Sequence, residues 1–90
     1  MRTPTDPRQL WSADWWTDRA VLLELWRERA LERAHAVGGA VERARRAGAI
    51  YRAAVLFACW RRCIAIANHH RELAQIARCH AAMFATRGAA

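Results

Sequence analysis

The chain has 90 residues, of which 54% are hydrophobic, and its 15 Arg against eight Asp and Glu give a formal net charge of +7 at pH 7. A chain of this length forms one domain with a small core, and no uninterrupted apolar run reaches the ~20 residues of a membrane span. The first seven residues contain no apolar signal segment, and the three Cys form no disulfide framework, so we expect a cytoplasmic protein.

The charge changes along the chain. Residues 1–42 hold six Arg and seven acids, whereas residues 43–90 hold nine Arg and one acid, Glu72. Lys is absent, and GC-rich codon usage explains Arg in its place, but it does not explain why acids nearly stop after Glu42. This distribution indicates a surface for an acidic partner, either nucleic acid or an acidic protein surface.

The first predicted element is a short helical turn at Asp6-Pro7, which follows a flexible arm of residues 1–6. A long helix is predicted next, over residues 12–37, with Ser12 or Thr17 as its N-cap. Its buried stripe recurs at three- and four-residue steps and comprises Trp16, Ala20, Leu23, Trp26, Ala30, Ala34 and Val37.

Gly38-Gly39 is the predicted stop of that helix, and a second helix is predicted over residues 40–67. This second helix carries two apolar stripes whose mean directions differ by roughly 160°. One stripe is Val41, Ala44, Gly48, Tyr51, Val55, Cys59 and Ile66, and the other is Ile50, Ala53, Phe57, Trp60, Ile64 and Ala67. A helix with two opposite apolar faces must be covered on both, so we expect a homodimer or an obligate heteromeric partner.

A break at Asn68-His69-His70 and a third helix over residues 70–86 complete the prediction. The fold class is therefore all-α, with a short N-terminal turn and three helices in a small bundle or layer. The alternative is that Asn68 does not interrupt the chain, in which case residues 40–86 form one rod that needs another subunit to cover it.

The basic half supplies the candidate binding residues. Seven Arg are candidates for contact with nucleic-acid phosphates or an acidic partner: Arg45, Arg46, Arg52, Arg61, Arg62, Arg71 and Arg78. The alternative is that these Arg border the core or pair with an acidic row on the first helix. That row comprises Asp14, Asp18, Glu24, Glu28 and Glu32.

A second set of residues indicates a protein interface. Trp11 and Trp15 form a candidate aromatic anchor, and they lie beside acid, which disfavours stacking on nucleic-acid bases. The first stripe of the second helix adds Val41, Ala44, Gly48, Tyr51 and Val55.

Catalytic and metal motifs are not recognisable, so we expect no enzyme, no cofactor and no metal. Cys59, Cys63 and Cys79, with His69, His70 and His80, offer zinc-ligand chemistry without a Cys-x2-Cys pair, and core packing explains them better. Two functions are predicted. The first is a small non-enzymatic protein that binds nucleic-acid phosphates or a nucleic-acid-handling complex. The alternative is a small protein-binding inhibitor or adaptor of mobile-element type, such as an anti-CRISPR or phage anti-host protein, by analogy of size and composition.

Overall fold

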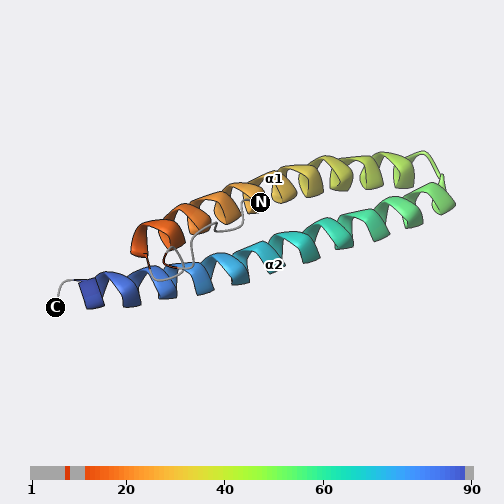
Figure 1. Cartoon of the computed structure of the whole chain (residues 1–90). Coiled ribbons are helices and arrows are strands. Elements are labelled where there is room, and N and C mark those ends of the chain that lie inside the picture. Colours follow the sequence, from red (N-terminus) through yellow and green to blue (C-terminus); the bar gives the residue numbers. More distant parts are fainter. Residues whose placement is uncertain (1–7, 9–11, 89–90) are drawn as a thin grey trace.

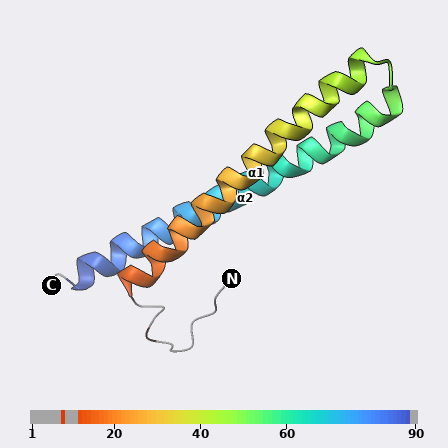
Figure 2. The same cartoon turned by 90° about the horizontal axis from the view of Figure 1, so that it is seen from above.

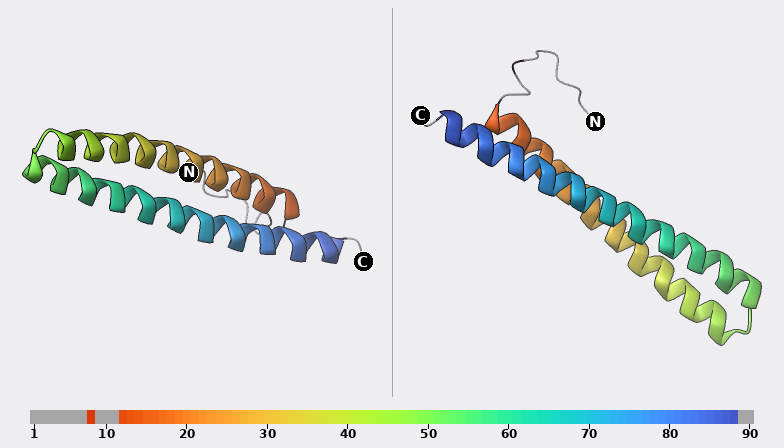
Figure 3. Two further views of the ribbon diagram at one scale, coloured as in Figure 1. Left: turned by 180° about the vertical axis from the view of Figure 1, so that it is seen from behind. Right: turned by 90° about the horizontal axis from the view of Figure 1, so that it is seen from below.

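The protein is a long helical hairpin. The computed structural model describes residues 8 and 12–88, and it consists of α1 (Ala13–Arg46) and α2 (Ile50–Gly88), which run antiparallel from the turn at residues 47–49 (Figure 1). The helices lie side by side in Figure 1 and on the left of Figure 3, and one passes in front of the other in Figure 2; the extents are 63 × 23 × 13 Å. The all-α prediction is confirmed, whereas the three-helix prediction is wrong. The predicted turn at Asp6-Pro7 lies outside the described residues.

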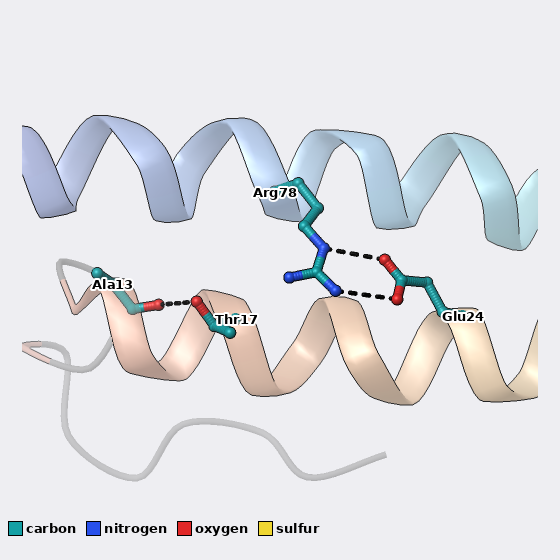
Figure 4. A network of polar contacts seen from close by, with 4 residues as sticks. All are labelled: Ala13, Thr17, Glu24 and Arg78. Atoms are coloured by element: carbon teal, nitrogen blue, oxygen red, sulfur yellow. Dashed lines mark hydrogen bonds and ion pairs between the residues drawn. The ribbon is translucent and has the colours of Figure 1, made fainter.

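Helix α1 begins where its capping residue predicts. Ser12 has an extended backbone, and its hydroxyl accepts a hydrogen bond from the backbone N–H of Trp15 at 3.5 Å. Asp14 lies in the first turn, where the helix dipole favours an anion. The Thr17 hydroxyl instead donates to the Ala13 carbonyl at 2.9 Å (Figure 4), so Thr17 belongs to the helix and Ser12 is the cap.

The predicted stop at Gly38-Gly39 is wrong, because α1 continues through both residues to Arg46. Each Gly costs about 1 kcal/mol relative to Ala in a helix interior, which packing against α2 outweighs. The Trp60 ring lies over Gly38, where an added Cβ would meet its Cδ1 at 3.5 Å. Gly38 is therefore part of the contact between the helices, whereas the neighbour of Gly39 is the Arg43 side chain of the same helix.

The helix actually ends at Gly48, which was predicted to lie inside a helix. Gly48 has φ +74°, its N–H bonds to the Arg45 carbonyl at 3.0 Å, and the Ala49 N–H bonds to the Ala44 carbonyl at 2.9 Å. These two bonds around a left-handed glycine form the Schellman motif that closes a helix C-terminus. The predicted boundary between the first two helices is thus displaced by about nine residues.

The predicted break at Asn68-His69-His70 is also wrong, since α2 is continuous over 39 residues. Asn68 and His69 are exposed on this helix, and His70 lies against α1. The alternative of an uninterrupted rod is correct for this part of the chain, although the rod begins at Ile50 and not at residue 40.

The contact between the helices repeats every seven residues, as in a coiled coil. In heptad notation, α1 places Ala13, Ala20, Arg27, Ala34 and Val41 at position a, and Trp16, Leu23, Ala30, Val37 and Ala44 at position d. Helix α2 places Ala53, Trp60, Ala67, Ala74 and Ala81 at a, and Leu56, Cys63, His70, Ala77 and Phe84 at d. The ten buried hydrophobic residues are Leu23, Val41 and eight Ala, so the core is one thin seam.

Candidate binding face

The heptad register divides the hairpin surface into two sides. In an antiparallel pair, position e of one helix lies beside e of the other, and g lies beside g. Glu24 and Arg78 are both at e and are hydrogen-bonded to each other, which fixes the side that positions b and e form. Trp26 and Leu73, both at g, pack against the buried residues Ala20, Leu23, Ala74 and Ala77 from the other side, which positions c and g form.

Positions c and g form what we call the arginine face. Its cations are Arg19, Arg29, Arg33 and Arg43 of α1 and Arg52, Arg62 and Arg87 of α2. No Asp or Glu occupies a c or g position anywhere between residues 12 and 88. This side of the hairpin therefore has a formal charge of +7 from its own positions and contains no acid within them.

Positions b and e form what we call the mixed-charge face. Its acids are all on α1 and comprise Asp14, Glu24, Glu28 and Glu42. Its cations are Arg45 of α1 and Arg61, Arg71 and Arg78 of α2. Four acids against four Arg leave this side neutral, with the negative charge on one helix and most of the positive charge on the other.

The ion pairs between described side chains both lie on the mixed-charge face. Arg78 donates from Nε and Nη2 to the two carboxylate oxygens of Glu24, each at 2.9 Å (Figure 4). The hydrogen bond from Arg78 lowers the pKa of the Glu24 carboxyl below its ordinary value. Arg45 and Glu42 form a looser pair at 3.6 Å within α1. Arg and acid thus lie close enough to neutralise each other on this side.

The arginine face is not uniform along its length. Near the open end of the hairpin it carries apolar side chains, namely Leu22, Trp26, Leu73, Ile76 and Met83. Trp15 lies on this side too, with the Arg19 guanidinium 5.3 Å from its ring centroid. Towards the turn, the side chains of Arg29, Arg33 and Arg62 are exposed. Most of the large apolar side chains therefore lie towards the open end, and Arg side chains occur along the whole face.

At the turn end, one groove on the arginine face is lined by an Arg from each helix. Arg43 of α1 and Arg52 of α2 line it, and its volume is about 290 Å³. The remaining lining residues are small or apolar: Ala40, Ala44, Ala47, Ala49 and Leu56. Two guanidinium groups beside a shallow apolar floor suit an anionic group such as a phosphate, because Arg presents several donors in a fixed plane.

The structure distributes the seven predicted Arg over both sides. Arg52 and Arg62 lie on the arginine face. Arg45, Arg61, Arg71 and Arg78 lie on the mixed-charge face, and Arg46 is exposed at position f beside the turn. The prediction compared the charges of residues 1–42 with those of residues 43–90, so it overlooked Arg29 and Arg33, which precede Glu42. The seven-residue spacing of their positions is the signal that would have identified them.

The predicted interface residues do not form one surface. Val41 and Ala44 are buried in the seam, and Gly48 is in the turn. Tyr51 and Val55 are exposed on α2, on the other side of that turn. The stripe was drawn along one helix, and the turn at residues 47–49 divides it between two. Trp15 is half-buried, and Trp11 lies outside the described residues.

His70 and His80 pack against α1, whereas Cys59, Cys79 and His69 are exposed, so the predicted core packing holds for only part of this set. The His80 ring lies 4.4 Å from the Trp16 ring, and the His70 ring lies 5.7 Å from the Trp26 ring, measured between centroids. Within the described part of the chain, no three His, Cys, Asp or Glu side chains are grouped closely enough to hold a metal ion. Neither α1 nor α2 has a segment long and apolar enough to cross a membrane.

Comparison with known proteins adds no identification. No family model matches the chain, and neither the curated proteins nor the solved structures contain a match.

Proposed function

We propose that this chain is a small non-enzymatic protein that binds nucleic acid through the arginine face. The observation that carries the proposal is the absence of any acid from positions c and g over the whole hairpin, beside seven Arg. An extended cationic surface without acids attracts a polyanion, and release of the polyanion's counterions drives the binding.

The geometry fits contact with the phosphate backbone more closely than base reading. From Arg52 to Arg87 the face follows 35 residues of α2, which is about 52 Å at 1.5 Å per residue. Its Arg are distributed along that length, and Arg43 and Arg52 converge at one end. A long row of separated cations suits phosphates spaced along a nucleic acid, and it carries no information on sequence by itself.

A pair of charge-matched triple variants tests the proposal. Arg33→Gln/Arg43→Gln/Arg62→Gln removes three charges from the arginine face, and Arg45→Gln/Arg61→Gln/Arg71→Gln removes three from the other Arg positions. Fluorescence anisotropy with a labelled duplex, from 50 to 200 mM salt, measures the slope of log affinity against log salt. The first variant should reduce that slope by about 2.7, and the second should leave it nearly unchanged.

Two results would overturn the proposal. One is the absence of binding to either duplex or single-stranded nucleic acid at 50 mM salt. The other is an equal loss of affinity in both triple variants, because that result would make net charge, and not the arginine face, responsible for binding.

A second candidate function rests on the exposed apolar side chains of the same face. Val55, Ile66, Ile76 and Met83 are large, exposed and on the c and g side, and nucleic-acid phosphates make no use of them. An acidic protein surface with apolar side chains would contact both the Arg and the apolar side chains, as the predicted inhibitor or adaptor requires. The double substitution Ile76→Ser/Met83→Ser should weaken the binding of a protein partner and leave the affinity for a duplex unchanged. An oligomer, as the sequence predicts, is part of the proposal in either case.

A further inference from the structure

The isolated hairpin has more surface than a stable monomer of its size. Its accessible surface is 6946 Å², whereas a compact protein of 10.3 kDa has about 5,400 Å². Its radius of gyration is 18.5 Å, compared with about 12 Å for a compact 90-residue domain. The difference of about 1,500 Å² is more than one partner's share, about 800 Å², of a standard protein interface.

The mixed-charge face carries the apolar groups for such an interface. Ile50 is 82% exposed, and Phe57 is 48% exposed. Both line a groove of about 350 Å³ at the turn end, together with Val41 and Ala54. Val21 and Leu31 extend this exposed apolar surface along α1.

Charge decides which side can bind a second copy of the same chain. A symmetric dimer places the same face of each copy in contact, so each face must be compatible with itself. Two arginine faces would bring fourteen Arg together with no acid, which is strongly repulsive. Two mixed-charge faces bring equal numbers of acids and Arg together.

We propose that a second copy of this chain docks on the mixed-charge face and that each α1 lies over α2 of its partner. A twofold axis along the length of the hairpin produces this arrangement, because it exchanges the two helices and keeps their height. On this face α1 has four acids and one Arg, and α2 has three Arg and no acid, so each helix meets its electrostatic complement. The result is a four-helix bundle with an arginine face on each outer side.

The first test measures mass in solution for two matched substitutions. Phe57 at position e and Val55 at position c are 48% and 47% exposed, so they differ mainly in the side that they occupy. Light scattering at micromolar concentration should give a dimer for the unmodified chain and for Val55→Glu, and a monomer for Phe57→Glu. A monomeric unmodified chain would overturn the proposal, and so would a dimer that Val55→Glu disrupts and Phe57→Glu does not.

A second pair guards against loss of folding, because the Phe57 ring also stacks on Trp60. Ile50 and Tyr51 are 82% and 84% exposed, so neither substitution removes much packing within the hairpin. Ile50→Glu should weaken the dimer, and Tyr51→Glu at position f should not. Circular dichroism confirms helix content in each variant. Equal effects from the two substitutions would contradict the assignment of the face.

The orientation has its own test. With the axis along the hairpin, the two turns lie at the same end of the dimer. Spin labels at Tyr51→Cys, in a chain whose three native Cys are replaced, should report a distance well below the 63 Å length of the hairpin. A distance near that length would place the turns at opposite ends and overturn the stacking of α1 on the partner's α2. Duplex binding is measured separately, so failure of nucleic-acid binding leaves the dimer test intact.

Discussion

The mixed-charge face and the arginine face both carry Arg, but they differ in whether acids lie beside those Arg. On the mixed-charge face, Arg78 is held by both oxygens of Glu24, and Arg45 lies near Glu42. On the arginine face, Arg29, Arg33 and Arg62 are exposed, and positions c and g supply no acid to pair with them. On the mixed-charge face, Arg45 and Arg78 therefore form ion pairs within the protein. On the second side, Arg29, Arg33 and Arg62 are exposed to solvent, so their guanidinium groups are accessible to an anionic partner.

The difference shows that helical position, and not position along the chain, sorts the charge. The break in acidity at Glu42 falls four residues before α1 ends, so it nearly coincides with the turn. That break has two consequences. On the mixed-charge face, the acids come from α1 and most of the Arg come from α2. On the arginine face, Arg of both helices share positions without an acid, which a count of charges in the two halves of the sequence does not detect.

The largest effects are expected from substitutions in the buried seam between the helices, because that seam sets the register of the two faces. Leu23 and Ala77 belong to one buried cluster and are 2% and 1% exposed. Leu23→Ala should destabilise the hairpin by about 2–3 kcal/mol, because it leaves a cavity. Ala77→Leu should cost about 1–3 kcal/mol, because the helices must separate. Urea unfolding followed by circular dichroism measures both, and Ala65→Leu at exposed position f is the control.

The two glycine sites should respond to Ala in opposite directions. Gly48→Ala should destabilise the protein by about 1 kcal/mol, because an L-residue is strained at φ +74°. Gly38→Ala should stabilise it by up to ~1 kcal/mol, because the new methyl would meet Trp60 at ordinary contact distance within a helix. Thermal melts compare the two. Equal effects would contradict the turn at residues 47–49, and with it the pairing of α1 acids with α2 Arg.

These glycines also explain what sequence reasoning predicted correctly and what it did not. The cap at Ser12 and the all-helical fold followed from local rules that the structure obeys. Gly38-Gly39 looked like a stop because two glycines in succession usually end a helix, but the seam continues through Val37, Val41 and Ala44. The true stop carried a signal as well, since three Arg in the last turn precede Gly48.

The candidate face was only partly predictable for a related reason. The two apolar stripes were predicted to lie on one helix, but the turn at residues 47–49 divides the first stripe between α1 and α2. Ala53, Trp60 and Ala67 of one stripe lie in the seam, whereas Val55 and Ile66 of the other stay exposed. The face that Arg29 or Arg61 occupies depends on the register between the helices. The sequence did not reveal that register, because the turn was predicted at the wrong residues.

A single acid placed on either surface should sharpen the contrast. Ala36 is exposed at position c on the arginine face, and Ala65 is exposed at position f. Ala36→Glu should reduce the salt slope of duplex binding by about 1, because the added acid competes for a neighbouring Arg. Ala65→Glu changes net charge equally and should have little effect. Anisotropy titrations at three salt concentrations measure both, and identical slopes would mean that the polyanion does not recognise a face.

The smallest effect should come from the ion pair on the mixed-charge face. Glu24→Gln removes the anion that holds Arg78, and both side chains are nearly half exposed, so the fall in Tm should be slight and smaller than that of Gly48→Ala. The sign of its pH dependence follows from the lowered pKa of Glu24, whose ordinary value is 4.5. A carboxyl with a lowered folded-state pKa stabilises the fold above its unfolded pKa, and that contribution is lost as pH falls.

The difference in Tm between the unmodified chain and Glu24→Gln should therefore be constant between pH 5 and 7 and should diminish below about pH 4.5. Glu32→Gln is the control, because Glu32 is exposed at position f and pairs with no described residue. A difference that grows as pH falls would contradict the pairing of Glu24 with Arg78. Added salt at pH 7 should reduce the difference, because an exposed ion pair is screened. On the arginine face, where positions c and g hold no acid, substitution of the exposed Arg33 or Arg62 should show no such loss on acidification.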